Sequence, residues 1–375
     1  MTEMLPLFAT AAKGTEVALR DELRSFRFRH VRADRGGVHF EGTMADAGRA
    51  CLWSAIAVRI LTRVGEGAAT GGQELYDTVR AIDWTPHLTP KMTIAVSAVV
   101  RDSHLNHTQF IAQKTKDAIV DGQRDRGGER SSVDLADADL RVFVLIVRDK
   151  AQVFLDCSGD ALHLRGYRTD VGVAPLKETL ASAILGYSEW DRTSPLIDPM
   201  CGAGTIAIEA AMRARNIAPG ILRKHFGFER WASHDATTRA AMTDLRAAAK
   251  AGATTECPPI DASDFDSRVL DLAKANAERA GVASSITLKN VRIGDLERRT
   301  GAGWLVTNPP YDERMRADDR VWSEISSGLY RVPDYNAVLL SGSPDLERAI
   351  SQKPRFKIPL WNGTIECRLV GYGPR

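Results

Sequence analysis

The sequence has 375 residues, of which 44% are hydrophobic and 26% are charged, so its composition is that of a folded globular protein rather than a disordered one. Its formal net charge of +2 neither requires nor excludes a nucleic-acid partner. Five scattered cysteines contain no CxxC pair, which argues against a metal site and a disulfide framework, and the absence of a long apolar run favours a cytoplasmic protein without a membrane partner.

The amino-terminal segment combines short apolar runs with several arginines. Residues 7–23 predict a strand followed by a helix, because a short apolar run gives way to apolar residues at helical spacing. Residues 24–32 alternate apolar and basic side chains, which is typical of a half-buried strand. Arg24, Arg27 and Arg29 form either a stripe that contacts an RNA backbone or a solvated strand face, and the sequence leaves both interpretations open.

The next hundred residues show the same mixture of helical and extended patterns. The spacing of apolar residues predicts, in chain order, a helix at 44–64, a strand at 93–100, a helix at 103–121 and two strands at 140–148 and 151–157. The histidines of the second helix lack a neighbouring cysteine or third histidine, so a surface role is favoured over metal binding.

From residue 175 onwards, predicted helices and strands alternate in the manner of an α/β sheet. Helices are predicted from residue 175 and at 206–215, 269–280 and 318–330, and strands at 195–197, 286–288, 304–306 and 337–340. The chain closes with a predicted antiparallel pair at 356–359 and 365–370, linked by an Asn362-Gly363 turn.

A glycine-rich loop lies between the first of these strands and the helix that follows it. Residues 195–205 read PLIDPMCGAGT. No Lys-Ser/Thr follows the last glycine and the GxGxxG spacing is absent, so the loop is neither a phosphate loop nor a dinucleotide fingerprint. An acidic residue at the strand end suits a cationic ligand such as S-adenosylmethionine, which carries a sulfonium and an ammonium group. We assign this cofactor to Asp198, Pro199, Cys201, Gly202, Gly204 and Thr205.

Two further acidic positions extend the predicted cofactor pocket. Asp264 comes 66 residues after Asp198, and its carboxylate can accept hydrogen bonds from both ribose hydroxyls. Asp266 is the alternative ribose ligand, although it is also placed to cap the following helix. Asp295 is predicted to accept a hydrogen bond from the adenine amino group, with a solvated turn as the alternative.

The loop after residues 304–306 carries the most specific chemistry. It reads Asn308-Pro309-Pro310-Tyr311, and neither proline can donate a hydrogen bond to a sheet ladder. A rigid loop at the carboxyl end of a strand is where an open α/β sheet binds its ligand. The Asn308 side-chain oxygen and the Pro309 carbonyl can accept hydrogen bonds from one exocyclic amine, and Tyr311 offers a face for a base. We assign all four residues to catalysis and Asn308 also to the cofactor pocket, with an ordinary proline-rich turn as the alternative.

The glycine-rich loop and the Asn308 loop, in this order, resemble the class I methyltransferases that modify amino groups of bases. Four other segments are similar to the THUMP-containing methyltransferases that make N2-methylguanosine: LFATAAKG at 7–14, GGVHF at 36–40, LWS at 52–54 and LHLRGYR at 162–168. The resemblance covers nearly the whole chain and is greatest to the large-subunit (23S) ribosomal RNA guanine-N2 methyltransferase family. One difference is that enterobacterial members carry a second, fused methyltransferase half, which this sequence does not contain.

This resemblance implies a doubly wound, Rossmann-like class I methyltransferase domain preceded by an α+β region that binds RNA. We expect a ferredoxin-like segment at 1–45, a THUMP domain at 46–160 and the methyltransferase domain at 166–375. To the three arginines above we add Lys114, Arg165 and Arg168 as expected RNA contacts, the last two within the segment similar to the family.

The implied reaction is methyl transfer from S-adenosylmethionine to N2 of a guanosine, with 23S ribosomal RNA as the expected substrate. The alternatives are a transfer RNA guanine-N2 methyltransferase and a non-catalytic RNA-binding assembly factor. Adenine-N6 methylation uses a similar loop but fits the amino-terminal half less well. Monomer and homodimer both remain open.

Overall fold

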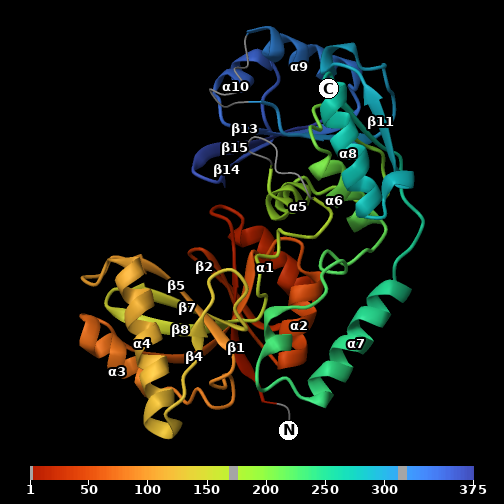
Figure 1. Cartoon of the computed structure of the whole chain (residues 1–375). Coiled ribbons are helices and arrows are strands. Elements are labelled where there is room, and N and C mark those ends of the chain that lie inside the picture. Colours follow the sequence, from red (N-terminus) through yellow and green to blue (C-terminus); the bar gives the residue numbers. More distant parts are fainter. Residues whose placement is uncertain (1–2, 169–175, 311–318) are drawn as a thin grey trace.

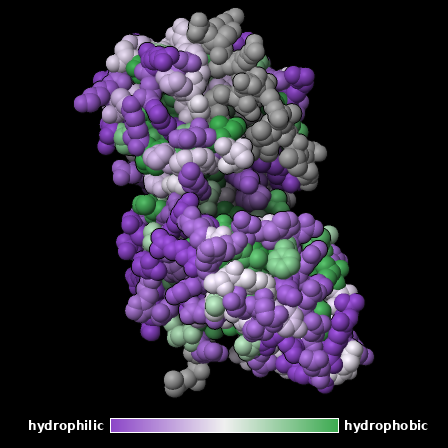
Figure 2. Space-filling model, turned by 90° about the vertical axis from the view of Figure 1, so that its left-hand side faces the viewer, coloured by the Kyte–Doolittle hydropathy of each residue, from purple (hydrophilic) through white to green (hydrophobic). Residues whose placement is uncertain are grey.

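The computed structural model describes residues 3–168, 176–310 and 319–375. These residues form two lobes (Figure 1), with a narrower waist between them in the space-filling view (Figure 2). Each lobe is built on one mixed β-sheet. Within the three described ranges, no helix combines the length and the apolar character needed to cross a membrane.

The amino-terminal lobe is a single eight-stranded sheet with helices on one face. Its elements are β1 (Leu5–Thr10), α1 (Glu16–Ser25), β2 (Arg29–Asp34), β3 (Gly37–Gly42), α2 (Met44–Trp53), β4 (Arg59–Ala68), α3 (Gly72–Arg80), β5 (Thr93–Arg101), α4 (Thr108–Gly127), β6 (Ser132–Val133), β7 (Leu140–Val147) and β8 (Lys150–Asp156). The strand order is β2-β3-β1-β4-β8-β7-β5-β6, and the antiparallel β4–β8 pair joins the two parts of the lobe. Alternate strand residues such as Ile60, Val144 and Val153 pack with α1–α4 in one core.

Two predicted elements of this lobe were wrong at their ends. The helix predicted at 44–64 ends at Trp53, and β4 begins at Arg59, because residues from Arg59 onwards pair with both β1 and β8. The strand predicted at 24–32 starts only at Arg29, since α1 runs to Ser25. Local periodicity does not reveal such pairing partners, which lie far away in the sequence.

The carboxyl-terminal lobe is a doubly wound α/β sheet, which confirms the predicted fold class. Its elements are α5 (Glu178–Tyr187), β9 (Leu196–Asp198), α6 (Thr205–Ala214), η1 (Gly227–Arg230), α7 (Ala236–Ala251), β10 (Ile260–Asp264), α8 (Ser267–Arg279), η2 (Ala283–Ser285), β11 (Ile286–Asn290), η3 (Ile293–Asp295), β12 (Gly303–Thr307), α9 (Asp319–Arg331), β13 (Tyr335–Ser341), α10 (Asp345–Ala349), β14 (Phe356–Asn362) and β15 (Ile365–Tyr372). The strand order is β11-β10-β9-β12-β13-β15-β14, with β9 to β13 parallel and the last hairpin antiparallel.

Alternate residues of the central strands point to opposite faces of this sheet. Leu196, Val306 and Leu340 pack with α5, α6 and α8 on one face. Their chain neighbours Ile197 and Leu305 pack with α9 and α10 on the other. Near-continuous apolar runs are what a parallel sheet covered on both faces requires.

Residues 218–252, here called the strap, run from the carboxyl-terminal lobe back over the amino-terminal lobe. The Gly220 amide donates to the Leu52 carbonyl at 2.9 Å, and the Phe228 amide donates to the Cys157 carbonyl at 3.2 Å. Met242 of α7 fills the space beside Gly48 of α2, where an added β-carbon would come within 2.4 Å of the Met242 sulfur. The strap therefore ties the two lobes together, with α7 lying along the side of the molecule (Figure 1).

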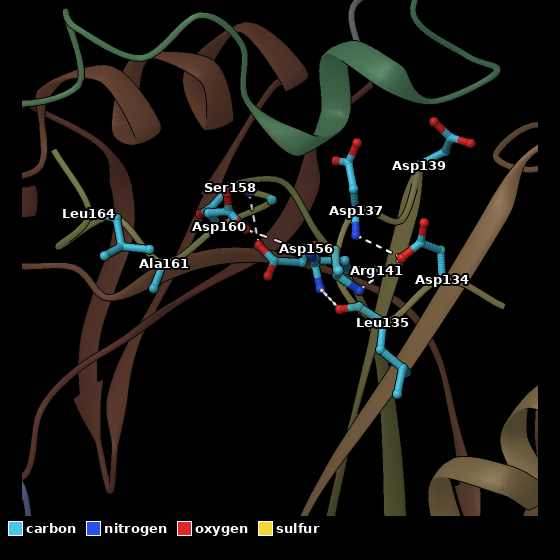
Figure 3. Close-up of polar contacts among 12 residues, drawn as sticks. Asp134, Leu135, Asp137, Asp139, Arg141, Asp156, Ser158, Asp160, Ala161 and Leu164 are labelled. Atoms are coloured by element: carbon cyan, nitrogen blue, oxygen red, sulfur yellow. Dashed lines mark hydrogen bonds and ion pairs between the residues drawn. The ribbon is translucent and has the colours of Figure 1, made fainter. Parts of the chain in front are cut away.

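Two arginines of the strap add side-chain polar contacts to the amino-terminal lobe. Arg223 donates to four main-chain carbonyls in the segment after β8, at 3.0 to 3.3 Å: those of Ser158, Asp160, Ala161 and Leu164. Arg230 pairs with Asp137 and Asp139. Figure 3 shows these two carboxylates beneath the green ribbon of the strap, next to the turn that begins at Asp134.

Candidate functional site

A cleft of about 350 Å³ opens at the carboxyl ends of β9, β10 and β12. Strand β9 lies between β10 and β12, so the chain reverses its strand order at this point. Such a switch point leaves a crevice between neighbouring loops and is where open α/β sheets bind ligands. The glycine-rich loop, the end of β10 and the Asn308 loop all contribute to its lining.

Asp198 lies at the floor of the cleft, and its side chain is only 1% exposed. Thr307, at the end of β12, donates a 2.8 Å hydrogen bond from its hydroxyl to Asp198 Oδ1. Burial raises the pKa of the Asp198 carboxyl to about 7, and the nearby Asp264 carboxylate acts in the same direction. A buried carboxylate in this position is more easily ionised when a cation lies beside it.

The glycine-rich loop folds around Asp264. The Gly202 amide donates to Asp264 Oδ2 at 3.0 Å, and the Asp266 amide donates to Oδ1 at 3.1 Å. Gly204 has a φ of 81°, a left-handed conformation that favours glycine, and a β-carbon there would come within 3.0 Å of Ala273. The loop residues Pro199, Cys201, Gly202 and Thr205 line the cleft, whereas Gly204 supports the loop from behind.

Asp264 and Asp266 both line the cleft but have different partners. Asp266 caps α8 by accepting a hydrogen bond from the Arg268 amide at 2.9 Å, and it also pairs with the Arg268 guanidinium at 2.7 Å. The capping role foreseen for Asp266 is therefore present. Which of the two carboxylates holds a ribose stays a prediction.

An aromatic side chain that the sequence analysis missed lies between these two aspartates. Phe265 is 61% exposed although it lines the cleft, and the Arg292 guanidinium lies 4.9 Å from its ring centroid. Ile293, Val269 and Leu272 add apolar surface to the same wall. An exposed phenylalanine directly after an acidic strand end was the signal that could have identified this wall.

The Asn308 loop closes the other side of the cleft. Asn308 and Pro310 line it, and Pro309 is buried between them. Asn308 Oδ1 is buried and has no hydrogen-bond partner among the described residues. A buried acceptor left unpaired costs about 1–3 kcal/mol, so this atom is prepared for an incoming donor. Tyr311, the fourth predicted catalytic residue, lies outside the described residues.

The segment that ends at Arg168 contains two of the predicted RNA contacts, and the structure corrects one of them. Arg165 is 1% exposed and is enclosed by Glu209 and main-chain carbonyls, so it cannot contact RNA. Arg168 lines the cleft and donates to Thr205 Oγ1 at 2.5 Å. Arg165 is therefore a buried arginine in an ion pair, and its role is to hold the structure together rather than to bind a ligand.

The remaining predicted residues lie away from the cleft. Arg24, Arg27 and Arg29 are exposed on the amino-terminal lobe, and the Lys114 ammonium lies 5.1 Å from the ring centroid of Tyr76. Asp295 is exposed at the end of η3 and is not part of the cleft lining. These assignments stay predictions. In the described part of the chain, no group of three or more His, Cys, Asp or Glu side chains is placed to hold a metal ion.

Three family models match successive segments of the chain. The RlmL ferredoxin-like domain matches residues 6–61, the THUMP domain matches 70–156, and the RMKL-like methyltransferase domain matches 165–371. The expected boundary at residue 45 falls in the first turn of α2, whereas the first match runs on into β4.

Curated relatives of this chain include ribosomal RNA large subunit methyltransferases K/L. That of Methylococcus capsulatus is 42% identical over 371 residues, which are 96% of this chain and 50% of the relative. That of Syntrophotalea carbinolica is 37% identical over 99% of this chain and 54% of the relative. The chain therefore spans about half the length of the curated relatives it matches.

Solved structures of similar length have the same fold. A methyltransferase solved in complex with SAH is 32% identical, with a TM-score of 0.89 over all of this chain and 99% of that one. A protein of Listeria monocytogenes named a predicted N6-adenine-specific DNA methylase is 30% identical, with a TM-score of 0.89 over all of this chain and 97% of that one. The predicted resemblance is confirmed: the chain belongs to the family of RMKL-like methyltransferase domains.

Proposed function

We propose that this chain transfers a methyl group from S-adenosylmethionine to N2 of a guanosine in 23S ribosomal RNA. The observation that carries the proposal is the unpartnered, buried Asn308 Oδ1 in the cleft, since an exocyclic amine supplies the donor that this acceptor lacks. The names of the curated relatives support ribosomal RNA of the large subunit as the substrate.

The side chains of the cleft support the binding of this cofactor. Asp198 would lie beside the positively charged end of the cofactor, and Asp264 would accept hydrogen bonds from the ribose. Phe265 and Ile293 would hold the adenine between flat and apolar surfaces. When bound, S-adenosylmethionine supplies an electrophilic methyl group. The solved relative in complex with SAH supports this assignment.

The Asn308 loop would orient the acceptor amine. Asn308 Oδ1 and the Pro309 carbonyl would each accept one of the two amine hydrogens, which leaves the nitrogen lone pair directed away from the loop and toward the methyl group. The two prolines keep these acceptors in place, so alignment supplies most of the rate. The proton can leave to water after transfer, and the target base must be unstacked to enter the cleft.

We further propose that the amino-terminal lobe captures the RNA. The ferredoxin-like segment at 1–45 and the THUMP domain at 46–160 remain our division of this lobe, with Arg24, Arg27, Arg29 and Lys114 as RNA contacts. Because the strap holds this lobe against the catalytic one, a bound RNA would be presented to the cleft at a fixed distance.

The test is methylation of purified RNA followed by mass spectrometry of its nucleosides. The protein is incubated with unmodified 23S ribosomal RNA or with transfer RNA, and the products are separated as N2-methylguanosine and N6-methyladenosine. We expect N2-methylguanosine in the ribosomal RNA alone. N2-methylguanosine in transfer RNA would support the alternative substrate, and N6-methyladenosine would contradict the guanine assignment. If neither nucleoside forms while RNA still binds, a non-catalytic assembly factor is the better account.

A further inference from the structure

A second cavity, of about 1170 Å³, lies on the face of the eight-stranded sheet opposite to helices α1–α4. Strands β1, β2, β3, β4, β5, β7 and β8 all contribute side chains to it, so it extends across both parts of the amino-terminal lobe. We call it the sheet groove and define it by its floor residues Phe8, Leu145 and Phe154, its wall residues Arg32, Asp34, His39 and Arg63, and its end residues Arg35, Arg101, Arg148 and Lys150.

The floor of the sheet groove is apolar. Phe8 and Phe154 pack with Leu61, and Leu145 lies partly exposed beside them, with the partly exposed Phe143 at the border of the groove. These residues alternate along the strands with those that pack against the helices, and no described helix covers them. A sheet face of this kind, which offers aromatic and aliphatic surface to solvent, is suited to unstacked bases.

One end of the groove carries four cations from three turns. Arg35 lies in the β2–β3 turn, Arg101 ends β5, and Arg148 and Lys150 flank the β7–β8 turn. Hydrogen bonds connect the three turns: Arg101 Nη1 donates to the Arg35 carbonyl at 2.8 Å, and the Arg148 amide donates to the Arg101 carbonyl at 3.2 Å.

These four cations differ from the other charged residues of the groove. None of them forms an ion pair with a carboxylate within the described ranges, whereas Arg63 pairs with Glu66 and Arg32 with Asp34. Asp149 is occupied by the amide and the ring of His104, at 2.8 and 2.7 Å. Asp102 also lines this end, so positive charge exceeds negative charge there.

The same end of the groove adjoins the carboxyl-terminal lobe. The Ala11 amide donates to the Gly36 carbonyl of the β2–β3 turn at 2.9 Å. Two residues further on, the Lys13 ammonium lies 3.5 Å from the ring centroid of Trp361, in the β14–β15 hairpin. A strand held in the groove would therefore leave it beside the lobe that contains the cleft.

We propose that the sheet groove binds a single-stranded segment of the substrate RNA. Phosphates contact Arg35, Arg101, Arg148 and Lys150, and unstacked bases lie against Leu145 in the floor and against Phe143, which borders the floor. A duplex does not fit this chemistry, because its bases are stacked inside and cannot reach an apolar floor. The inference rests on the proposed function, which makes RNA the substrate.

The test measures RNA binding by the full chain at several salt concentrations, with single-stranded and duplex fragments of 23S ribosomal RNA. The groove variant carries Arg35→Gln, Arg101→Gln, Arg148→Gln and Lys150→Gln. For single strands, the slope of log affinity against log salt should fall by about 0.7 per lost phosphate contact, or about 3 for the four cations. Affinity near 0.1 M salt should fall about tenfold or more.

A matched control removes four exposed cations elsewhere: Lys224→Gln, Arg239→Gln, Lys250→Gln and Lys274→Gln. This variant should keep the wild-type slope, and an equal loss in both variants would overturn the proposal because net charge alone would explain it. A second variant, Phe143→Ala at the border of the groove floor, should weaken single-strand binding about fivefold or more without changing the slope.

The outcomes separate the groove from the proposed function. An unchanged salt slope in the groove variant, with wild-type RNA binding intact, overturns the groove and leaves the proposed function standing. Preference of the wild-type protein for duplex over single strands also overturns the groove. Absence of any RNA binding by the wild-type protein overturns both. Binding of S-adenosylmethionine by each variant confirms that its fold is intact.

Discussion

Replacing Asp198 by asparagine should make cofactor binding independent of pH. The Asp198 carboxyl is buried beside Thr307 and Asp264, and its pKa is raised to about 7, mainly by burial. A cationic cofactor binds the ionised carboxylate better than the neutral acid. Affinity for S-adenosylmethionine should therefore rise with pH through about 7 and become constant above about pH 8.

The size of this effect follows from the pKa. At pH 6 about one tenth of a group with a pKa of about 7 is ionised, so the affinity should be about tenfold lower than at pH 8. Asp198→Asn should bind weakly at both pH values, with no tenfold difference between them.

The same pKa makes a prediction for the stability of the protein without cofactor. The folded-state pKa lies above the value of 3.8 for an exposed carboxyl, so the folded state holds the proton more tightly. This group's contribution to stability is unaffected below pH 4, falls as the pH rises from about 4 to 7 and is constant above that. The total loss is up to about 4 kcal/mol, which Asp198→Asn should recover in part at pH 8.

Calorimetry with S-adenosylmethionine between pH 6 and pH 8, together with thermal unfolding of both proteins, measures these effects. The reasoning is refuted if wild-type affinity is constant over this range, or if Asp198→Asn keeps the wild-type pH dependence. Either result would mean that a different group carries the charge that the cofactor meets.

Three further predictions separate the roles of the cleft residues. Asn308→Ala should leave cofactor affinity almost unchanged while turnover on ribosomal RNA falls about a hundredfold or more, because misalignment of the amine is costly; near-normal turnover would reduce the loop to a turn. In calorimetry, Asp264→Ala should weaken cofactor binding about tenfold or more, whereas Asp266→Ala should mainly destabilise α8, by about 1 kcal/mol in thermal unfolding; the reverse pattern would make Asp266 the ribose ligand. Phe265→Ala should weaken cofactor binding about fivefold or more while the more conservative Phe265→Tyr binds normally, and equal affinities for all three proteins would remove the ring from the adenine site.

The sequence revealed the cleft more completely than its surroundings. Asp198 and Asn308 were predictable because each lies at the end of a short apolar strand, directly before a proline that cannot donate to a sheet ladder, and parallel strands bring such ends together. Phe265 was missed because an aromatic residue between two acids has no helical or strand periodicity that marks it.

Contacts between segments that are distant in the sequence explain why Arg165 was wrongly assigned to RNA binding and why the role of the strap was not predicted. Arg165 reads as a basic surface residue in its local sequence, but Glu209 lies 44 residues further on and encloses it. The strap appeared only as an insertion between Asp198 and Asp264. Its aromatic residues Phe228 and Trp231 are buried against the amino-terminal lobe, so residues 166–375 alone would expose apolar surface. The full chain is therefore the appropriate protein for cofactor measurements.

The most direct test of the central claim replaces the acceptor amine itself. Once the methylated guanosine has been mapped, RNA is prepared with inosine at that position, which lacks the exocyclic N2 amine, or with 2-aminopurine, which retains it. The account predicts that methyl transfer to the inosine RNA disappears while both RNAs still bind, and that transfer to the 2-aminopurine RNA persists. Continued methylation of the inosine RNA at the same position would contradict the assignment of N2 as the acceptor.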